Sequence, residues 1–205
     1  MRKALDPPGQ ARDDHWIIAE LARAGYDAQA IGNREFHYMF AALAARAQQM
    51  RYPLLCSNLI DLHGRKLPFL DQLRVENAHG SIYLAALLIM QYPPGSFWER
   101  IFGWRFLDPV AVITQHAQRV RDDECFIVLS HLGLSLDRKL AAAVPRIDLL
   151  LGGHSHDTLA QPYMVGAVLI VHAGPYGRFA SLTELRKERA RARLDRFELV
   201  PLVPA

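Results

Sequence analysis

The strongest constraint on this chain is an apolar run that ends in two glycines and two histidines, Leu149-Leu150-Leu151-Gly152-Gly153-His154-Ser155-His156. Residues 147–151 are apolar except for Asp148 and predict a buried strand, and the glycines let the backbone turn sharply at its end. Loops at the ends of strands hold the chemistry of α/β proteins. His154 and His156 are therefore a candidate metal pair, although two histidines on a solvated turn would leave the same short pattern.

Three other predicted strands also lead into polar groups. Residues 126–129 run into His131, residues 26–31 lead to Asn33, and residues 168–171 open into His172. A metal site needs several donors at one place, and the ends of neighbouring strands supply them. The convergence of these groups with His154 and His156 predicts a metal site.

Taken in order, four motifs resemble those of the calcineurin-like metallophosphoesterases, in particular the catalytic domain of the 5'-nucleotidase branch. The motifs are Gly-Asn-Arg-Glu, Ser-His-Leu-Gly, Gly-Gly-His-Ser-His and Ala-Gly-Pro-Tyr-Gly-Arg. The resemblance implies a metallo-dependent phosphatase-like four-layer α/β/β/α sandwich. It also implies that Asn33, His131 and His154 bind the second metal of the family's pair and that His156 binds the first. His172 falls where the family has a polar residue and is not expected to be a ligand.

The chain departs from the family before Asn33. The family's domain begins with a strand that ends in Asp-x-His and another that ends in Gly-Asp, and no such strands precede Asn33 here. Asp61-Leu62-His63 has the spacing but lies downstream, and Asp6 is followed by two prolines. We therefore expect a single domain over residues 1–205 that is truncated at its N-terminus and has no C-terminal nucleotide-binding domain. Such a chain should bind one divalent ion, Mn, Zn or similar, where the complete family site binds two.

Arg34 stands where the family has the catalytic His of Asn-His-Glu. A guanidinium stays charged at any accessible pH, so Arg34 could clamp a phosphate oxygen but could not donate a proton to a leaving group. The expected catalytic residues are Arg34 and His131, and the expected substrate contacts are Arg34, Asn58 and Tyr176. Asn58 also suits a turn.

Three classes of function compete. The first is a metal-dependent phosphoesterase that acts on a small phosphorylated substrate, with a nucleotide as the class that the resemblance implies. The second is a catalytically degenerate relative that binds a phosphate compound or one metal ion without turnover, which Arg34 and the missing ligands favour. The third, a nucleic-acid-binding module, rests only on the arginine-rich residues 186–193, whose interleaved Glu and Ala equally suit a solvated hairpin.

Composition fits one globular domain without a membrane partner. The chain has 205 residues, of which 51% are hydrophobic and 22% charged, and this balance excludes disorder as the default. The most apolar stretch, residues 82–90, is too short for a bilayer and predicts a strand. Cys56 and Cys125 lie beside apolar strand residues and predict reduced core thiols, and with no secretory signal they indicate a cytoplasmic protein.

The remaining pattern predicts alternating strands and helices. Helices are expected from Asp13 or Asp14 to Gly25 and over residues 36–50, 109–120 and 136–143, and strands over residues 28–32, 52–58, 180–186 and 194–199. Residues 66–71 are expected to form a hairpin with residues 75–86. The aromatic loop of residues 91–106 could cover a substrate or pack on its own domain. If the family's first strands are missing, Ile31 and residues 126–129 would be exposed, which predicts self-association through strand edges.

Overall fold

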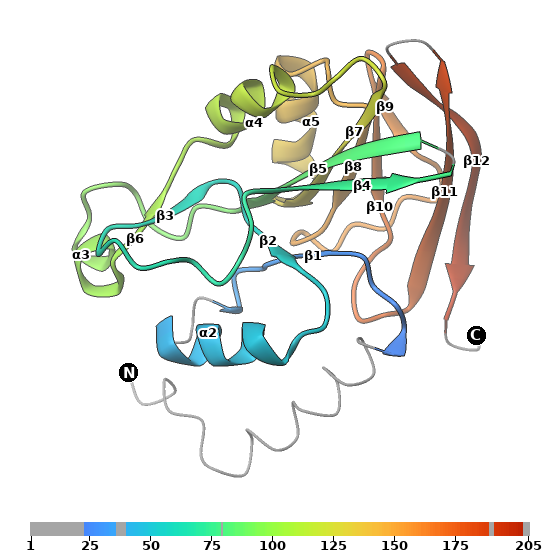
Figure 1. The fold of residues 1–205 in the computed structure, drawn as a ribbon. Helices are drawn as coiled ribbons and strands as arrows, with labels where there is room; N and C mark the ends of the chain where they lie inside the picture. The colour runs from blue at the N-terminus through green and yellow to red at the C-terminus, as the bar shows by residue number, and fades with distance from the viewer. Residues whose placement is uncertain (1–22, 36–39, 79, 189–190, 203–205) are drawn as a thin grey trace.

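A six-stranded sheet forms the centre of the computed structural model, which describes residues 23–35, 40–78, 80–188 and 191–202 (Figure 1). The strand order is β4-β5-β7-β8-β10-β9, in which the four inner strands are parallel and the two edge strands pair antiparallel. The bounds are Gln72–Asn77 for β4, Gly80–Leu88 for β5, Glu124–His131 for β7, Leu149–Gly152 for β8, Tyr163–Val165 for β9 and Val168–His172 for β10.

The inner strands end at one level of the sheet. Leu88 lies opposite His131, Ser130 lies opposite Gly152, and Gly152 lies opposite His172. These strands are nearly continuous apolar runs because both of their faces are covered. Their shared direction and register bring the polar residues at their carboxyl ends to one edge of the sheet.

Two helices cover one face of the sheet, α4 over Pro109–Ala117 and α5 over Leu134–Ala143 (Figure 1). Asp108 caps α4 by accepting a hydrogen bond from the Ala111 N–H at 2.8 Å, and Pro109 suits the first helical turn, where no backbone donor is needed. The largest core of the molecule lies between these helices and the sheet, and its members include Tyr83, Ile113, Phe126, Leu140, Ile147 and Ile170.

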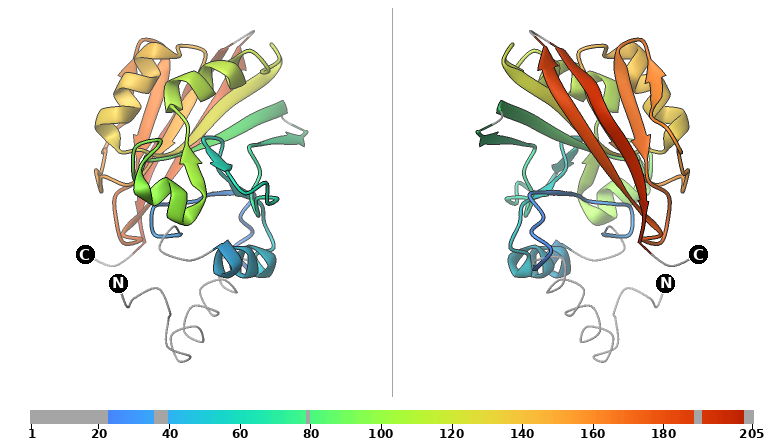
Figure 2. Two further views of the ribbon diagram at one scale, coloured as in Figure 1. Left: turned by 90° about the vertical axis from the view of Figure 1, so that its left-hand side faces the viewer. Right: turned by 90° about the vertical axis from the view of Figure 1, so that its right-hand side faces the viewer.

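A long hairpin packs on the other face of the sheet (Figure 2). Its strands are β11, Phe179–Glu188, and β12, Arg191–Pro201. Alternate residues of β11 are exposed, so only one side of this ribbon meets the sheet. Leu185 and Phe197 pack there against Leu149, Leu169 and Val171.

A second group of short elements lies beyond the sheet, on the side away from α4 and α5 (Figure 1). It consists of the strand pair β1 (Gln29–Ala30) and β2 (Leu54–Leu55), the pair β3 (Leu59–Asp61) and β6 (Trp104–Phe106), and the helices α2 (Phe40–Gln49) and α3 (Phe97–Phe102). Their apolar side chains form a second core around Trp104. Helices, main sheet, smaller strands and α2 follow one another as the layers of the α/β/β/α sandwich, which confirms the predicted fold class.

Two predicted elements differ from the structure. The hairpin partner of β5 is β4 at residues 72–77, and residues 66–71 form mostly irregular chain before it. The aromatic loop contains α3 and β6, and Trp104 and Phe106 are buried in the second core. These aromatics therefore serve the domain's own packing, while Phe97 and Trp98 on α3 stay exposed.

The predicted exposure of the strand edges is wrong for the residues named. Ile31 is 1% exposed, and Phe126 and Val128 are fully buried, because α2 and its neighbours cover the first and α4 and α5 cover the others. The open edges of the main sheet are β4 and β9. Self-association stays a prediction.

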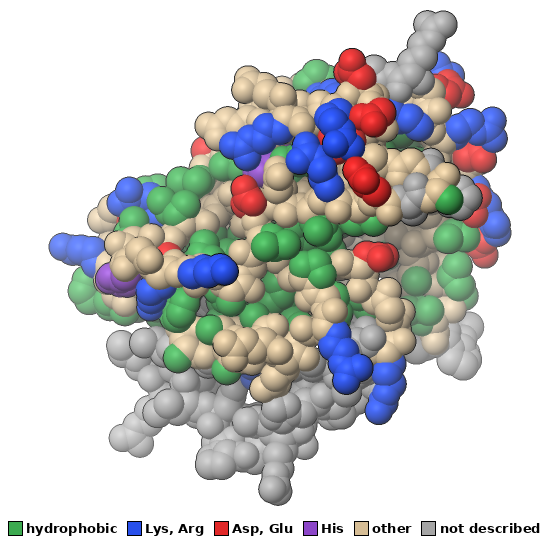
Figure 3. Space-filling view, viewed as in Figure 1, with side chains coloured by type: hydrophobic (Ala, Val, Ile, Leu, Met, Phe, Trp, Pro, Cys, Tyr) green, Lys and Arg blue, Asp and Glu red, His purple; other side chains and the backbone are tan. Residues whose placement is uncertain are grey.

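The arginine-rich run lies on the β11–β12 hairpin, and charged side chains among its described residues have partners in this domain. Arg186 pairs with Asp195 at 2.8 Å, and the Arg191 guanidinium donates to the Ile147 carbonyl at 3.0 Å. Figure 3 shows Lys and Arg side chains lying among Asp and Glu on the upper part of one face. On that face the charges alternate in sign, whereas a nucleic-acid-binding surface is a patch of positive charge.

Both cysteines are buried and unpaired, as predicted, and burial raises the pKa of each thiol to about 12. Among the described residues, no helix is long and apolar enough to cross a membrane. The helix expected to end at Gly25 and the first turn of the one expected over residues 36–50 fall largely outside the described residues.

The packing of the aromatic segment gives a testable difference in stability. Trp104→Ala should lower the free energy of unfolding by about 3–5 kcal/mol, since it empties the second core, whereas the exposed Trp98→Ala should cost about 1 kcal/mol or less. Urea unfolding of the two variants measures both values. Equal losses would mean that residues 91–106 do not pack as described.

Candidate metal centre

Three donor atoms meet at the carboxyl end of β7. The Nε2 atom of His131 lies 3.0 Å from Oδ1 of Asn33 and 3.4 Å from Nδ1 of His154. The two imidazole rings meet edge to face, with centroids 5.0 Å apart. The structure thus brings together the three residues that the sequence assigned to one metal ion.

Asn33 reaches His131 because the turn after β1 lies against the imidazole. A Cβ atom on Gly32 would lie 3.0 Å from Cε1 of His131, so a larger residue here would push the turn away. Glu35 closes the turn by accepting a hydrogen bond from the Gly32 N–H at 2.7 Å. Gly32 and Glu35 of the Gly-Asn-Arg-Glu motif therefore fix the turn that places the Asn33 side chain beside His131.

The loop after β8 holds His154 and His156 in an uncommon conformation. Their φ angles are 74° and 62°, in the left-handed region that residues other than glycine rarely adopt. Such backbone costs on the order of 1–3 kcal/mol per residue and persists only where its surroundings hold it. The Ser155 hydroxyl helps by accepting a hydrogen bond from the Leu134 N–H, at 3.0 Å, at the start of α5.

The ring of His156 packs against Tyr176. Their ring centroids are 5.3 Å apart, and Tyr176, also at positive φ, is 79% exposed. Tyr176 therefore stands at the open rim of the site, where the sequence expected a substrate contact.

His131 is held in its neutral form. Burial lowers the pKa of His131 to about 4, with a further lowering from the nearby His154 and His156. Neutral imidazole has a free lone pair, which is the form that binds a metal ion. Two imidazole nitrogens and an amide oxygen suit Zn or Mn better than Ca, so this donor set fits the implied ion.

The ligands for a second ion are not assembled in the described part of the chain. No group of three or more His, Cys, Asp or Glu residues has metal-binding geometry there. Asp61 of the downstream Asp-Leu-His triplet accepts hydrogen bonds from Arg65 and from the His63 N–H, so it forms a local turn. Asp6 lies outside the described residues.

The other expected site residues differ in exposure. Arg34 is exposed on the turn beside Asn33. Asn58 is fully buried, and its side chain bonds to the backbone of Leu88 in both directions, at 2.8 Å each, so its polar groups join β5 to the chain after β2. The side-chain amide of Asn58 therefore stabilises the fold near the site, because its nitrogen and its oxygen are both engaged by the Leu88 backbone.

A buried network below the metal centre escaped the sequence analysis. Asp137 of α5 accepts hydrogen bonds from Ser130 and from His172, the latter at 2.7 Å. The ring of His172 occupies the space beside Gly152, where a side chain would stand. The available signal was the bare glycine at the end of β8, opposite a histidine in the next predicted strand.

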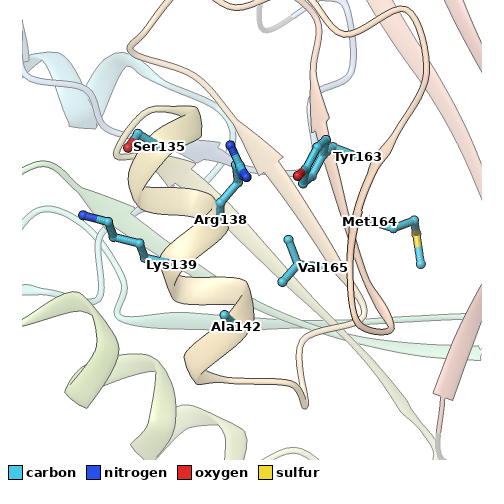
Figure 4. A pocket seen from close by; sticks show the side chains of 7 residues that line it. All are labelled: Ser135, Arg138, Lys139, Ala142, Tyr163, Met164 and Val165. Carbon is cyan, nitrogen blue, oxygen red and sulfur yellow. The ribbon is translucent and has the colours of Figure 1, made fainter.

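A groove of about 550 Å³ lies between α5 and β9, apart from the metal centre (Figure 4). Arg138 lies with its guanidinium 4.8 Å from the ring of Tyr163, and Lys139 and Met164 complete its polar and apolar walls. None of the predicted metal ligands lines this groove.

The sequence relatives include a metallophosphoesterase and a 5'-nucleotidase, although no family model matches the chain. The chain is 29% identical over 168 residues to YunD of Bacillus subtilis, an uncharacterized metallophosphoesterase, covering 80% of this chain and 36% of YunD. It is 25% identical over 154 residues to a snake venom 5'-nucleotidase of Gloydius brevicauda, covering 70% of this chain and 25% of that protein. The chain thus spans well under half the length of these relatives.

Solved structures share its fold. The sulfate thiohydrolase SoxB of Thermus thermophilus superimposes with a TM-score of 0.81 at 18% identity, over 94% of this chain and 36% of that one. A 5'-nucleotidase precursor of Thermus thermophilus gives a TM-score of 0.72 at 23% identity, over 95% of this chain and 41% of that one.

The two glycines after β8 should respond differently to alanine. A Cβ on Gly152 would lie 1.9 Å from Nε2 of His172 and 2.5 Å from Oδ2 of Asp137, whereas one on Gly153 would meet its nearest atom at 3.6 Å. We expect Gly152→Ala to lower the free energy of unfolding by about 3 kcal/mol and Gly153→Ala to change it by less than about 1 kcal/mol. Urea unfolding of both variants tests this, and similar values would contradict the close approach of His172.

Proposed function

We propose that the chain is a 5'-nucleotidase-type domain of the calcineurin-like metallophosphoesterase superfamily and that it hydrolyses a phosphate monoester with a metal-activated water. The observation that carries this proposal is the position of Nε2 of His131, which lies 3.0 Å from Oδ1 of Asn33 and 3.4 Å from Nδ1 of His154. A divalent ion bound there would lower the pKa of its water and polarise a phosphoryl oxygen.

The chain's own residues divide the remaining tasks. Asn33, His131 and His154 hold the ion, and His156 is the ligand that the family resemblance assigns to the other ion. Arg34, exposed beside Asn33, neutralises charge on the phosphoryl oxygens but leaves proton donation to water. Tyr176 offers an exposed ring at the rim to the organic part of the substrate.

A nucleotide is the substrate class we favour, because two of the relatives described above are named 5'-nucleotidases. The exposed ring of Tyr176 would pack on a base or sugar. Turnover of a nucleoside 5'-monophosphate should therefore exceed that of a small aliphatic phosphate monoester, and Tyr176→Ala should reduce the difference.

The second candidate is a relative that binds a phosphate compound or one ion without turnover. Arg34 in place of the family's histidine favours it, together with the lack of a second metal cluster in the described residues. Phosphate release from a nucleoside monophosphate by metal-loaded protein separates the candidates, since the degenerate relative would bind phosphate and release none.

Metal titration tests the proposed ligands. Calorimetry on metal-stripped protein should show about one Mn or Zn per chain, and His154→Ala should weaken this binding at least about 10-fold because it removes one of three protein donors. His63→Ala is the matched control, since His63 lies on the turn after β3 and should leave the affinity unchanged. Two equally tight ions would contradict a three-residue site.

Phosphate binding tests Arg34. Arg34→Ala should weaken phosphate binding to the metal-loaded protein by about 10-fold, as expected for loss of a charge-assisted hydrogen bond, and Arg34→Lys should restore part of it. Titration of inorganic phosphate by calorimetry measures this without requiring turnover. Equal affinity in wild type and Arg34→Ala would show that the guanidinium points away from the site.

A further inference from the structure

A buried chain of hydrogen bonds, Ser130–Asp137–His172, lies directly below the candidate metal centre. Asp137 is fully buried and His172 is 1% exposed. The two carboxylate oxygens of Asp137 have separate partners: Oδ1 accepts from the Ser130 hydroxyl, and Oδ2 lies 2.7 Å from Nε2 of His172. No task in the proposed reaction uses these three residues.

This network joins the ends of three strands to one helix. Ser130 belongs to β7, His172 to β10 and Asp137 to α5, and Gly152 of β8 leaves the space through which they meet. Ser130, Gly152 and His172 are neighbours in register across the sheet. The hydrogen bonds therefore fix the relative positions of the strand ends that carry the metal ligands.

The same residues hold both ends of the loop that carries His154 and His156. At its start, the Ser130 carbonyl accepts a hydrogen bond from the Gly153 N–H at 2.9 Å. At its end, the His172 carbonyl accepts one from the Leu159 N–H, also at 2.9 Å. Because both histidines of this loop have positive φ, the loop depends on these anchors to keep its conformation.

Ser130 also fixes the backbone on either side of His131. Its hydroxyl accepts a hydrogen bond from the Leu132 N–H at 3.2 Å while it donates to Asp137. His131 lies between these two bonded residues, so its backbone cannot shift without breaking one of them.

We propose that Asp137 and His172 are positioning residues for the metal centre: they hold the ends of β7, β8 and β10 so that His131 and His154 face one ion. This inference rests on the proposed function, because it assumes that the ion binds at Asn33, His131 and His154. Residues that orient metal ligands without touching the ion typically change metal affinity by 10- to 100-fold when they are replaced.

A second buried carboxylate provides a matched control. Asp148 is also fully buried and directly precedes the first residue of β8, at the end of the strand away from the metal loop. It accepts hydrogen bonds from the Phe126 and Ala192 N–H groups at 2.9 and 3.0 Å. Its removal should destabilise the same sheet, but it holds no residue of the metal loops. It separates positioning of ligands from general stability.

The test is calorimetric titration of Mn into metal-stripped full-length chain, with the thermal midpoint of each variant measured alongside. We expect Asp137→Asn and His172→Ala to weaken Mn binding by about 10- to 100-fold. Asp148→Asn should lower the thermal midpoint but leave the affinity within about twofold, since it lies outside the metal loops. His172→Gln, whose amide can still donate to Asp137, should recover much of the loss and guards against misfolding of the alanine variant.

Affinity losses that follow the thermal midpoint equally in all variants, including Asp148→Asn, would overturn the proposal and leave the network a stability element. Unchanged affinity in Asp137→Asn and His172→Ala would overturn it as well. If wild-type protein binds no Mn, the proposed metal centre fails and this inference fails with it. If wild type binds Mn and the Asp137 and His172 variants bind it equally well, the positioning role is refuted while the proposed metal centre stands.

Discussion

The structure depends on the close approach of three parallel strand ends around Gly152. Because this residue has no side chain, the ring of His172 can reach Asp137 beneath the end of β8, and Asp137 can reach Ser130. The parallel register then places His131 one residue beyond Ser130 and the histidine loop directly after Gly152. A side chain at position 152 would clash with the His172 ring and the Asp137 carboxylate. The candidate metal centre is thus a consequence of packing below it as much as of the histidines themselves.

Burial and charge follow from that arrangement. His131 lies in a partly buried position beside two other histidines, so it stays neutral, and its Nε2 atom faces Oδ1 of Asn33 and Nδ1 of His154. The short strands β1 and β2 bring Asn33 to the site from the other side of the sandwich, which means that both halves of the molecule contribute to one ion. An ion held in this way would stabilise the contact between the halves, because ligands that bind only the folded state add to its stability.

Sequence reasoning located the site well where a strict rule applied. The carboxyl ends of neighbouring parallel strands lie at the same edge of a sheet, so the sequence alone predicts that His131 and His154 lie close together. Asn33 was also expected at a strand end, and the family resemblance assigned it to the same ion as His131 and His154; its strand in the structure is only two residues long. The Asp137–His172 pair could not be predicted. Asp137 lies on a helix and His172 on a strand, and they are in contact only because Gly152 has no side chain to fill the space between them. The hairpin of β4 and β5 was misplaced because residues 66–71, with Leu67, Phe69 and Leu70, are more apolar than the true partner, whose apolar residues are Leu73 and Val75.

The most direct test of this account is anomalous X-ray diffraction from crystals soaked in zinc. The account predicts one strong peak at the carboxyl end of β7, about 2.0–2.2 Å from Oδ1 of Asn33, Nε2 of His131 and Nδ1 of His154. A peak at other histidines, such as His63 or His116, with none at this edge of the sheet, would contradict it.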